Sequence, residues 1–194
     1  MKPKNADCIA TQEIETPLGP MLAGATPDGI CLLEFAAPGR LGPQLDALAR
    51  LFRLPVRRAK HRHIDRLRRE LDRYFTRRLE RFTVPLVFPG TPFQVEVWKA
   101  LLAIPYGETR SYEDVARAVG RPRAVRAVGT ANGRNRIAVV IPCHRVINKS
   151  GALGGYGGGL GRKKRLLDLE GAPAAPPRTA PPKRQRVDGG RPRH

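Results

Sequence analysis

Long apolar runs, cysteines and acidic residues are all scarce in this sequence of 194 residues. No apolar run approaches the roughly 20 residues that a membrane-spanning helix requires. Residues 1–5 also lack the apolar core of a secretory signal peptide. These two absences argue against a membrane protein and a secreted one, so we expect a cytoplasmic protein with no membrane partner.

The cysteines are few, odd in number and widely spaced, at Cys8, Cys31 and Cys143. Such spacing does not form a disulfide framework, and free thiols fit a reducing compartment. The metal-binding patterns C-x-x-C and H-E-x-x-H are both missing. The glycine-rich segment 151–161 lacks the P-loop and dinucleotide patterns, so we interpret it as a loop that closes over a site. We predict no metal and no cofactor.

Acidic residues number 17 against 36 lysines and arginines, which gives a formal net charge of +19. This surplus favours a polyanionic partner, with nucleic acid first and an anionic membrane surface second. A basic surface that is merely solvated is the third interpretation. Residues 172–194 form a proline-rich basic tail that we expect to be disordered. The tail has three candidate roles: solubility, nonspecific DNA affinity, or nuclear import through residues 182–187.

The pattern of the first half predicts an α+β domain over residues 1–89. Strands are expected at residues 9–14, 20–25 and 30–35, with a turn at 27–29 where Pro and Gly favour chain reversal. They would form a small antiparallel sheet. Apolar residues at helical spacing predict helices at 41–52 and 61–82, followed by an extended connector at 83–88.

A mostly helical second domain is predicted over residues 90–171. Thr91, Pro92 and Gln94 form a helix-start pattern, and Ser111 caps another helix. Further helices are expected at about 123–131 and 162–170. The two short helices around the turn at 120–122 are a helix-turn-helix candidate, which the nearby arginines strengthen.

Cys143 is the residue of greatest chemical interest. It follows an apolar run at 137–141, expected to be buried and extended, and is flanked by Pro142, His144 and Arg145. A buried structural cysteine is the alternative, but such a cysteine needs no charged neighbours. A nucleophile reacts as the thiolate, so we expect the site to lower the pKa of Cys143. Side chains alternate along an extended segment, which leaves direct contact between His144 and the thiol open; a water could carry the proton instead, and Glu170 is a candidate to orient His144.

Beyond these residues, positions 91–171 resemble the O6-alkylguanine-DNA alkyltransferase family, the methylated-DNA–protein-cysteine methyltransferases. The segment 142–146, Pro-Cys-His-Arg-Val, matches the active-site motif of that family. Further matches follow in the family's order at 111–112, 126–129, 132–135, 151–156 and 166–170. Residues 8–88 resemble the family's N-terminal domain more loosely, which implies a ribonuclease H-like fold there.

The resemblance implies a stoichiometric DNA-repair reaction. Cys143 would take the alkyl group from O6-alkylguanine, with O4-alkylthymine as a further substrate, and keep it permanently. His144 would accept the thiol proton through a water, Glu170 would hold His144, and Asn135 would brace the cysteine segment. Tyr112 would give a proton to the leaving guanine. The target base must leave the stack to be reached.

Further residues receive roles from the same resemblance. Arg126 would fill the gap left by the extruded base. The other residues expected to contact DNA are Ser111, Tyr112, Arg123, Ala127 and Gly129. Those expected to line the base pocket are Pro142, Val146, Tyr156, Gly157 and Lys163. The carbonyls of Cys143 and Val146 would read the guanine amino group.

The expected partner is double-stranded DNA that contains O6-alkylguanine, bound by a monomer in the nucleoid of a bacterium or the nucleus of a eukaryote. Two departures from the family matter. Gly157 stands where relatives often have Ser, and the N-terminal zinc ligands of some relatives are incomplete here, with Cys8 and Cys31 alone. Two rival hypotheses stay open: a protein that binds lesions or regulates without transfer, and a nonspecific basic architectural protein.

Overall fold

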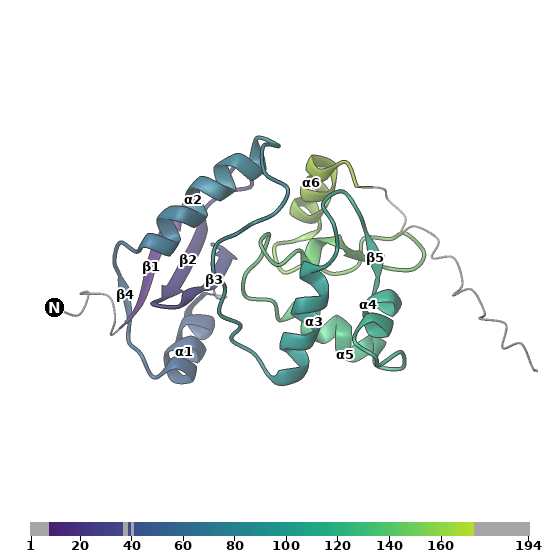
Figure 1. Cartoon of the computed structure of the whole chain (residues 1–194), viewed down its shortest axis with the longest axis horizontal. Helices are drawn as coiled ribbons and strands as arrows, with labels where there is room; N and C mark the ends of the chain where they lie inside the picture. The colour runs from purple at the N-terminus through teal and green to yellow at the C-terminus, as the bar shows by residue number, and fades with distance from the viewer. Residues whose placement is uncertain (1–7, 37–38, 40, 173–194) are drawn as a thin grey trace, which may run out of the picture.

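The computed structural model describes residues 8–36, 39 and 41–172, and the predicted basic tail lies outside them except for residue 172. The chain forms two halves that lie side by side, a sheet with two helices and a mostly helical part (Figure 1). This confirms the predicted α+β class. No helix in the described part of the chain is long and apolar enough to cross a bilayer.

The sheet of the first half has four strands in the order β3-β2-β1-β4. Strands β1 (Ile9–Ile14), β2 (Met21–Thr26) and β3 (Gly29–Phe35) are antiparallel neighbours, as predicted. The expectation of a purely antiparallel sheet was wrong, because β4 (Val56–Arg58) pairs with β1 in parallel. A three-residue, largely exposed strand has no alternating apolar pattern, so nothing in its sequence marks it as a strand.

Two helices cover opposite faces of this sheet (Figure 1). Helix α1 (Leu41–Phe52) packs Leu48 against the face that carries Leu32, and helix α2 (Arg62–Phe75) packs on the face that carries Leu33. The predicted extension of α2 to residue 82 was wrong. The Thr76 hydroxyl donates to the Asp72 carbonyl at 2.8 Å, and Arg77 takes a left-handed φ of 57°, which ends the helix.

The second half is built from four helices and two short strands. Helices α3 (Pro92–Leu102) and α4 (Tyr112–Ala118) begin with the predicted caps, and each has a full capping box. Helices α5 (Val125–Gly133) and α6 (Leu160–Glu170) follow. Strand β5 (Arg110–Ser111) pairs in parallel with β6 (Val146–Ile147), which brings the start of α4 beside the segment that follows Cys143.

The chain before Cys143 is buried, as predicted, but it is not extended, so that part of the prediction was wrong. Only Ile137 makes a strand-like bridge, to Leu33 of β3, and residues 138–140 then turn with Val139 at a φ of 70°. Cys143–Arg145 form a single 3-10 turn, η1. Because the Leu33 N–H and carbonyl bond to Arg136 and Ala138, the edge of the sheet anchors the segment that leads to the cysteine.

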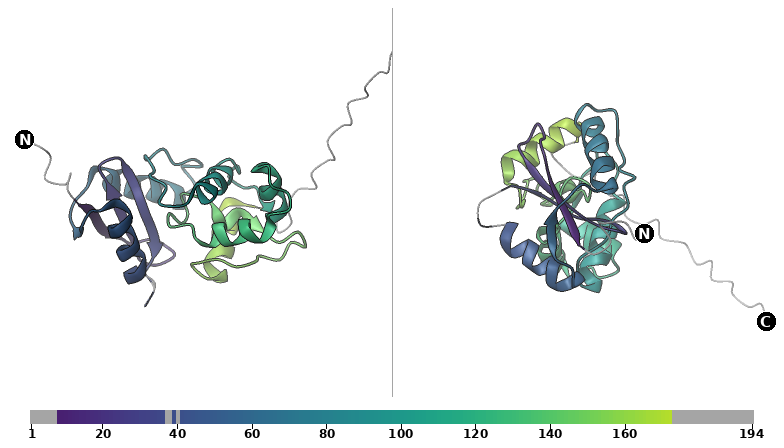
Figure 2. Two further views of the ribbon diagram at one scale, coloured as in Figure 1. Left: turned by 90° about the horizontal axis from the view of Figure 1, so that it is seen from below. Right: turned by 90° about the vertical axis from the view of Figure 1, so that its left-hand side faces the viewer.

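One hydrophobic core crosses both halves. It joins the α2 face of the sheet to α3, α4, α5 and the buried turn before Cys143. Figure 2 shows the sheet at one end of the molecule and the helices of the second half at the other. The segment that leads to Cys143 therefore rests on side chains of the first half, so its position depends on both halves.

Candidate active site

Asn135 clamps the turn that presents Cys143. Its side-chain NH₂ donates to the Ile141 carbonyl at 2.9 Å and to the Cys143 sulfur at 3.1 Å, and its Oδ1 accepts from the Ile137 N–H at 2.9 Å. A single amide thus fixes the backbone on both sides of the turn as well as the thiol. These contacts are compatible with the bracing role that the resemblance implies for Asn135.

The Cys143 side chain is only 5% exposed and lines a cavity of about 340 Å³. The cavity wall comes from the start of α4, the end of α5 and the glycine-rich loop; its other lining residues are Tyr112, Gly129, Asn132, Gly133, Gly155, Tyr156 and Gly157. The size and the single buried thiol fit a site that takes one planar ring system.

The expected lowering of the Cys143 pKa is not what the environment produces. Burial raises the pKa of the thiol to about 11, and the hydrogen bond from Asn135 and the charge of Lys163 offset only part of that rise. The resting group is therefore a thiol at neutral pH. A base must remove its proton when the sulfur reacts.

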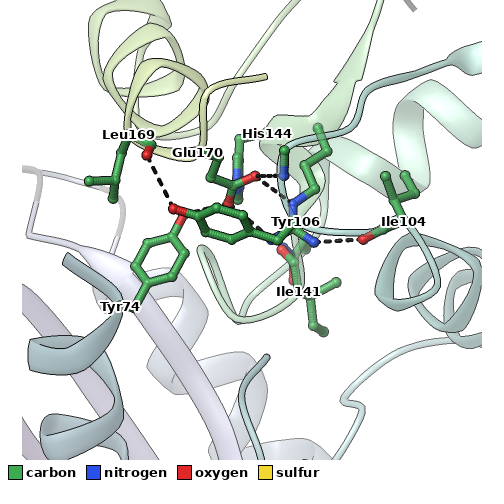
Figure 3. A network of polar contacts seen from close by, with 10 residues as sticks. Tyr74, Ile104, Tyr106, Ile141, His144, Leu169 and Glu170 are labelled. Atoms are coloured by element: carbon green, nitrogen blue, oxygen red, sulfur yellow. Dashed lines mark hydrogen bonds and ion pairs between the residues drawn. The ribbon is translucent and has the colours of Figure 1, made fainter. Parts of the chain in front are cut away.

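His144 is fully buried and is held by Glu170 (Figure 3). The Nε2 atom of His144 lies 2.9 Å from Glu170 Oε1. Arg145 donates to the same carboxylate from Nε at 2.8 Å and from Nη2 at 3.0 Å, while its Nη1 donates to the Ile104 carbonyl at 2.6 Å. The predicted pair of His144 and Glu170 is thus brought together, with Arg145 as a third member.

The charges in this network fix which nitrogen of His144 carries the proton. Burial alone would raise the pKa of Glu170, but the hydrogen bonds from His144 and Arg145, the charge of Arg145 and, in acid, the charge of protonated His144 outweigh it and lower the pKa to about 2. The carboxylate can only accept, so His144 Nε2 donates. Burial lowers the pKa of His144, which keeps the ring neutral at rest. Its Nδ1, buried and without a hydrogen-bond partner among the described residues, is then the basic atom.

Sequence reasoning missed one further member of this network, Tyr74, and a neighbour of it, Tyr106, whose hydroxyl bonds outside the network. Tyr74 on α2 donates to Glu170 Oε1 at 2.6 Å, although the two residues are 96 positions apart. Tyr106 lies beside Arg145, with its ring 5.8 Å from the guanidinium, and donates to the Leu169 carbonyl at 3.1 Å. Tyr74 sits at helical spacing among apolar residues, so its sequence pattern indicates a core residue and nothing more.

Tyr112 faces the cavity from the first turn of α4. Burial and the neighbouring Cys143 raise the pKa of its hydroxyl, so it stays protonated. A Cβ at Gly154 would lie 3.1 Å from that hydroxyl, and the left-handed φ of 66° at Gly154 also favours glycine. The glycine-rich loop therefore approaches the tyrosine closely because it lacks a side chain there.

Lys163 ties that loop to the cysteine segment from inside the protein. Its fully buried Nζ donates to the carbonyls of Val146 at 2.6 Å, of Gly155 at 3.4 Å and of Leu153. Burial lowers the pKa of Lys163 to about 8. The Val146 carbonyl expected to read guanine thus already accepts one hydrogen bond and has a second lone pair left, and the Cys143 carbonyl accepts from the Val146 N–H.

The residues expected to contact DNA lie in different surroundings. Arg123, Arg126 and Ala127 are exposed, the last two on α5, while Gly129 lines the cavity. Ser111 is buried, and its hydroxyl is engaged with Asp114 in the helix cap.

Pro142 was expected in the base pocket, but it lines a separate cavity of about 160 Å³ together with Phe82, Leu102 and Arg145. Cys8 and Cys31 are buried free thiols. Over residues 8–36, 39 and 41–172, no three His, Cys, Asp or Glu side chains group to hold a metal ion.

Comparisons with known proteins show which family this chain resembles. Residues 92–172 match the family described as the DNA-binding domain of 6-O-methylguanine DNA methyltransferase. A methylated-DNA–protein-cysteine methyltransferase of Methanosarcina barkeri is 45% identical over 158 residues, 81% of this chain and 94% of the relative. One of Mycobacterium bovis is 59% identical over 101 residues, 52% of this chain, and the match spans 61% of that relative's length.

Solved structures give a match over most of the fold. The O6-methylguanine methyltransferase of Mycobacterium tuberculosis is 41% identical, with a TM-score of 0.69, over 86% of this chain and 96% of that one. A structure of OGT from the same organism in complex with DNA is 40% identical with the same TM-score over the same shares of the two chains.

Proposed function

Because this chain belongs to the methylated-DNA–protein-cysteine methyltransferase family, we propose that it repairs DNA by moving an alkyl group from guanine O6 to Cys143. The transfer is irreversible and each molecule acts once. The observation that carries this proposal is the single buried thiol in the wall of a base-sized cavity, backed by the His144–Glu170 pair.

The chemistry follows from the protonation states of the site. The thiol proton of Cys143 passes to Nδ1 of His144 through a water that bridges the sulfur and this nitrogen. The sulfur then forms a bond to the alkyl carbon, the C–O6 bond breaks, and its electron pair goes to the guanine oxygen. Tyr112 gives its hydroxyl proton to the departing guanine and regains one from solvent, while His144 releases the thiol proton to solvent and returns to its neutral form. The net result is one proton moved from the thiol to guanine.

Access to the thiol requires the base to leave the duplex. Helix α5 presents the exposed Arg126 and Ala127, and Gly129 of the same helix lines the cavity. We propose that Arg126 occupies the space of the extruded base and that the small residues of α5 let this helix approach the minor groove. Arg123 and the backbone at Ser111 would contact the DNA backbone beside them.

We extend the proposal to the organisation of the chain. Helices α4 and α5 would act as a helix-turn-helix within a DNA-binding unit at 90–171, and residues 1–89 would form a unit with a ribonuclease H-like fold. The start of the family match at residue 92 supports the boundary. The protein would act as a monomer on duplex DNA in the nucleoid or the nucleus.

A direct experiment tests the reaction. The protein is incubated with duplex DNA containing O6-methylguanine, and the peptide that holds Cys143 is weighed. We expect a gain of one CH₂ unit on that peptide, none on the peptides of Cys8 and Cys31, and none in the variant Cys143→Ala. An unmodified Cys143 peptide in a protein that still binds the lesion would refute transfer and support the rival lesion-binding function.

The extrusion step has its own test. Arg126→Ala should slow repair of the duplex more than reaction with the free base O6-methylguanine. Arg165→Ala, which removes an exposed arginine from α6, is the matched control for lost charge. Equal slowing of the reaction with both substrates would refute a role for Arg126 in base extrusion.

A further inference from the structure

We propose that Tyr74, on helix α2 of the first half, is a positioning residue for alkyl transfer, because its hydroxyl holds the Glu170 carboxylate that orients His144. The inference rests on the proposed function, since it concerns the same proton relay. It gives the sheet-bearing half a defined part in the chemistry, through one hydrogen bond that crosses between the halves (Figure 3).

The geometry places Tyr74 in direct contact with the group that orients the base. Its side chain is 0% exposed, and its hydroxyl lies 2.6 Å from Oε1 of Glu170, the same oxygen that His144 Nε2 approaches at 2.9 Å. Arg145 spans both carboxylate oxygens, and the Gly107 N–H lies 3.4 Å from Oε2. Because Tyr74 and Arg145 already donate to Oε1, the His144 N–H can reach that oxygen only from a narrow range of directions.

The ring of Tyr74 is held independently of its hydroxyl. It packs edge-on against Phe75 with centroids 5.3 Å apart, and it lies 5.3 Å from Phe82 and 6.1 Å from Tyr106. The side chain is therefore fixed by its packing, and the hydroxyl is aimed at the carboxylate. Removing the oxygen alone leaves this aromatic cluster in place.

The hydroxyl also tunes the electrostatics at His144. The charged and titratable groups around the imidazole are Glu170 and Lys163 from α6, Arg145 and Cys143 from η1, and Tyr74 and Tyr106 around the carboxylate. Of these, Glu170 is the group that favours the imidazolium. A donor on Oε1 draws off part of its negative charge. Without Tyr74, the carboxylate would stabilise the imidazolium more strongly and would hold the ring less firmly.

The test is Tyr74→Phe against the matched control Tyr106→Phe. Both changes remove one hydroxyl from the same cluster, but the Tyr106 hydroxyl bonds to a backbone carbonyl and not to the carboxylate. Single-turnover transfer from duplex O6-methylguanine is measured from pH 5.5 to 9. We expect Tyr74→Phe to be about tenfold slower at pH 7, which equals ~1.4 kcal/mol. Its acid-side midpoint should move to higher pH, because protonated His144 cannot accept the thiol proton.

The control should keep the wild-type midpoint. A Tyr74→Phe profile that matches wild type in rate and midpoint would overturn the inference, as would the same change in both variants. A wild-type protein that transfers nothing would refute the proposed function instead. NMR separates the two cases without any transfer: in ¹⁵N-histidine protein, Tyr74→Phe should shift the His144 titration to higher pH, and an unmoved titration overturns the inference.

Wild-type protein supplies a measurement that does not depend on the variant folding. A phenol proton in a buried 2.6 Å bond to a carboxylate exchanges slowly with water, so Tyr74 should give a separate downfield hydroxyl resonance. That resonance should weaken as Glu170 is protonated in acid. Its absence at neutral pH would overturn the inference.

Discussion

Replacing Glu170 by Gln should destabilise the protein severely while hardly changing its shape. The carboxylate is 0% exposed and accepts from Arg145, His144 and Tyr74. The amide of Gln removes the charge and turns a donor toward a guanidinium that is 7% exposed. Breaking a buried ion pair on one side costs about 3–5 kcal/mol. At about 2–4 °C per kcal/mol for a chain of this size, the melting temperature should fall by roughly 6–20 °C.

The same carboxylate makes a specific contribution to acid sensitivity. Its pKa is about 2 in the fold against 4.5 for an ordinary Glu, which corresponds to about 3 kcal/mol. A group with a lowered pKa stabilises the fold above its unfolded value and loses that contribution as the pH falls. Wild-type stability should therefore decline between about pH 5 and pH 2 through this residue. In Glu170→Gln that part of the decline should disappear.

Urea unfolding of both proteins at pH 7, 5 and 3.5 measures the two effects together. The matched control is Glu108→Gln, which removes a carboxylate from a partly exposed pair with Arg110. That change should cost less than about 1 kcal/mol and leave the pH dependence unchanged. A loss below 1 kcal/mol for Glu170→Gln at pH 7, or an unchanged slope between pH 5 and 3.5, would refute the account of this network.

Two further predictions concern the loop and the turn around the thiol. Gly158→Ala would place a Cβ 2.6 Å from the buried ring of Phe35, so we expect the free energy of unfolding in urea to fall by about 1–3 kcal/mol and transfer to be slower. The control is Gly161→Ala on α6, which has open space around it. That change should leave the stability unchanged or raise it by up to about 1 kcal/mol. Asn135→Ala removes a hydrogen bond that lowers the Cys143 pKa, so iodoacetamide alkylation should need a higher pH; an unshifted pH profile would contradict that role.

Local patterns along the chain predicted most of the elements. The capping boxes at Thr91 and Ser111 each involve only four consecutive residues, so the local sequence alone determines their geometry. The strands of the first hairpin and most helix positions were confirmed for the same reason. The motif around Cys143 likewise pointed to Asn135 and His144, which the structure places in contact with the thiol and with Glu170; their roles as brace and base stay predictions.

The features that were missed depend on contacts between distant segments. Strand β4 exists because β1 offers it hydrogen bonds, and its own residues carry no strand pattern. Helix α2 was predicted to reach residue 82, but it ends at Phe75, and Phe82 packs on Tyr74 from the chain that follows the helix. The bond from Tyr74 to Glu170 joins two halves of the chain, and no local pattern encodes such a pairing.

The pairing of β5 with β6 has a consequence for how this chain tolerates change. Ser111, the residue before Tyr112, pairs with Ile147, four positions after Cys143, so the chain between them forms a closed loop whose two ends are hydrogen-bonded. We expect that insertions within this closed loop, or in the glycine-rich loop after it, can extend into solvent and leave the Tyr112 hydroxyl and the Cys143 thiol at the same separation. An insertion between Cys143 and Val146 would have no such room and would move the thiol. Redesign of this protein for other alkyl groups should therefore vary the loops and keep the length of that four-residue stretch.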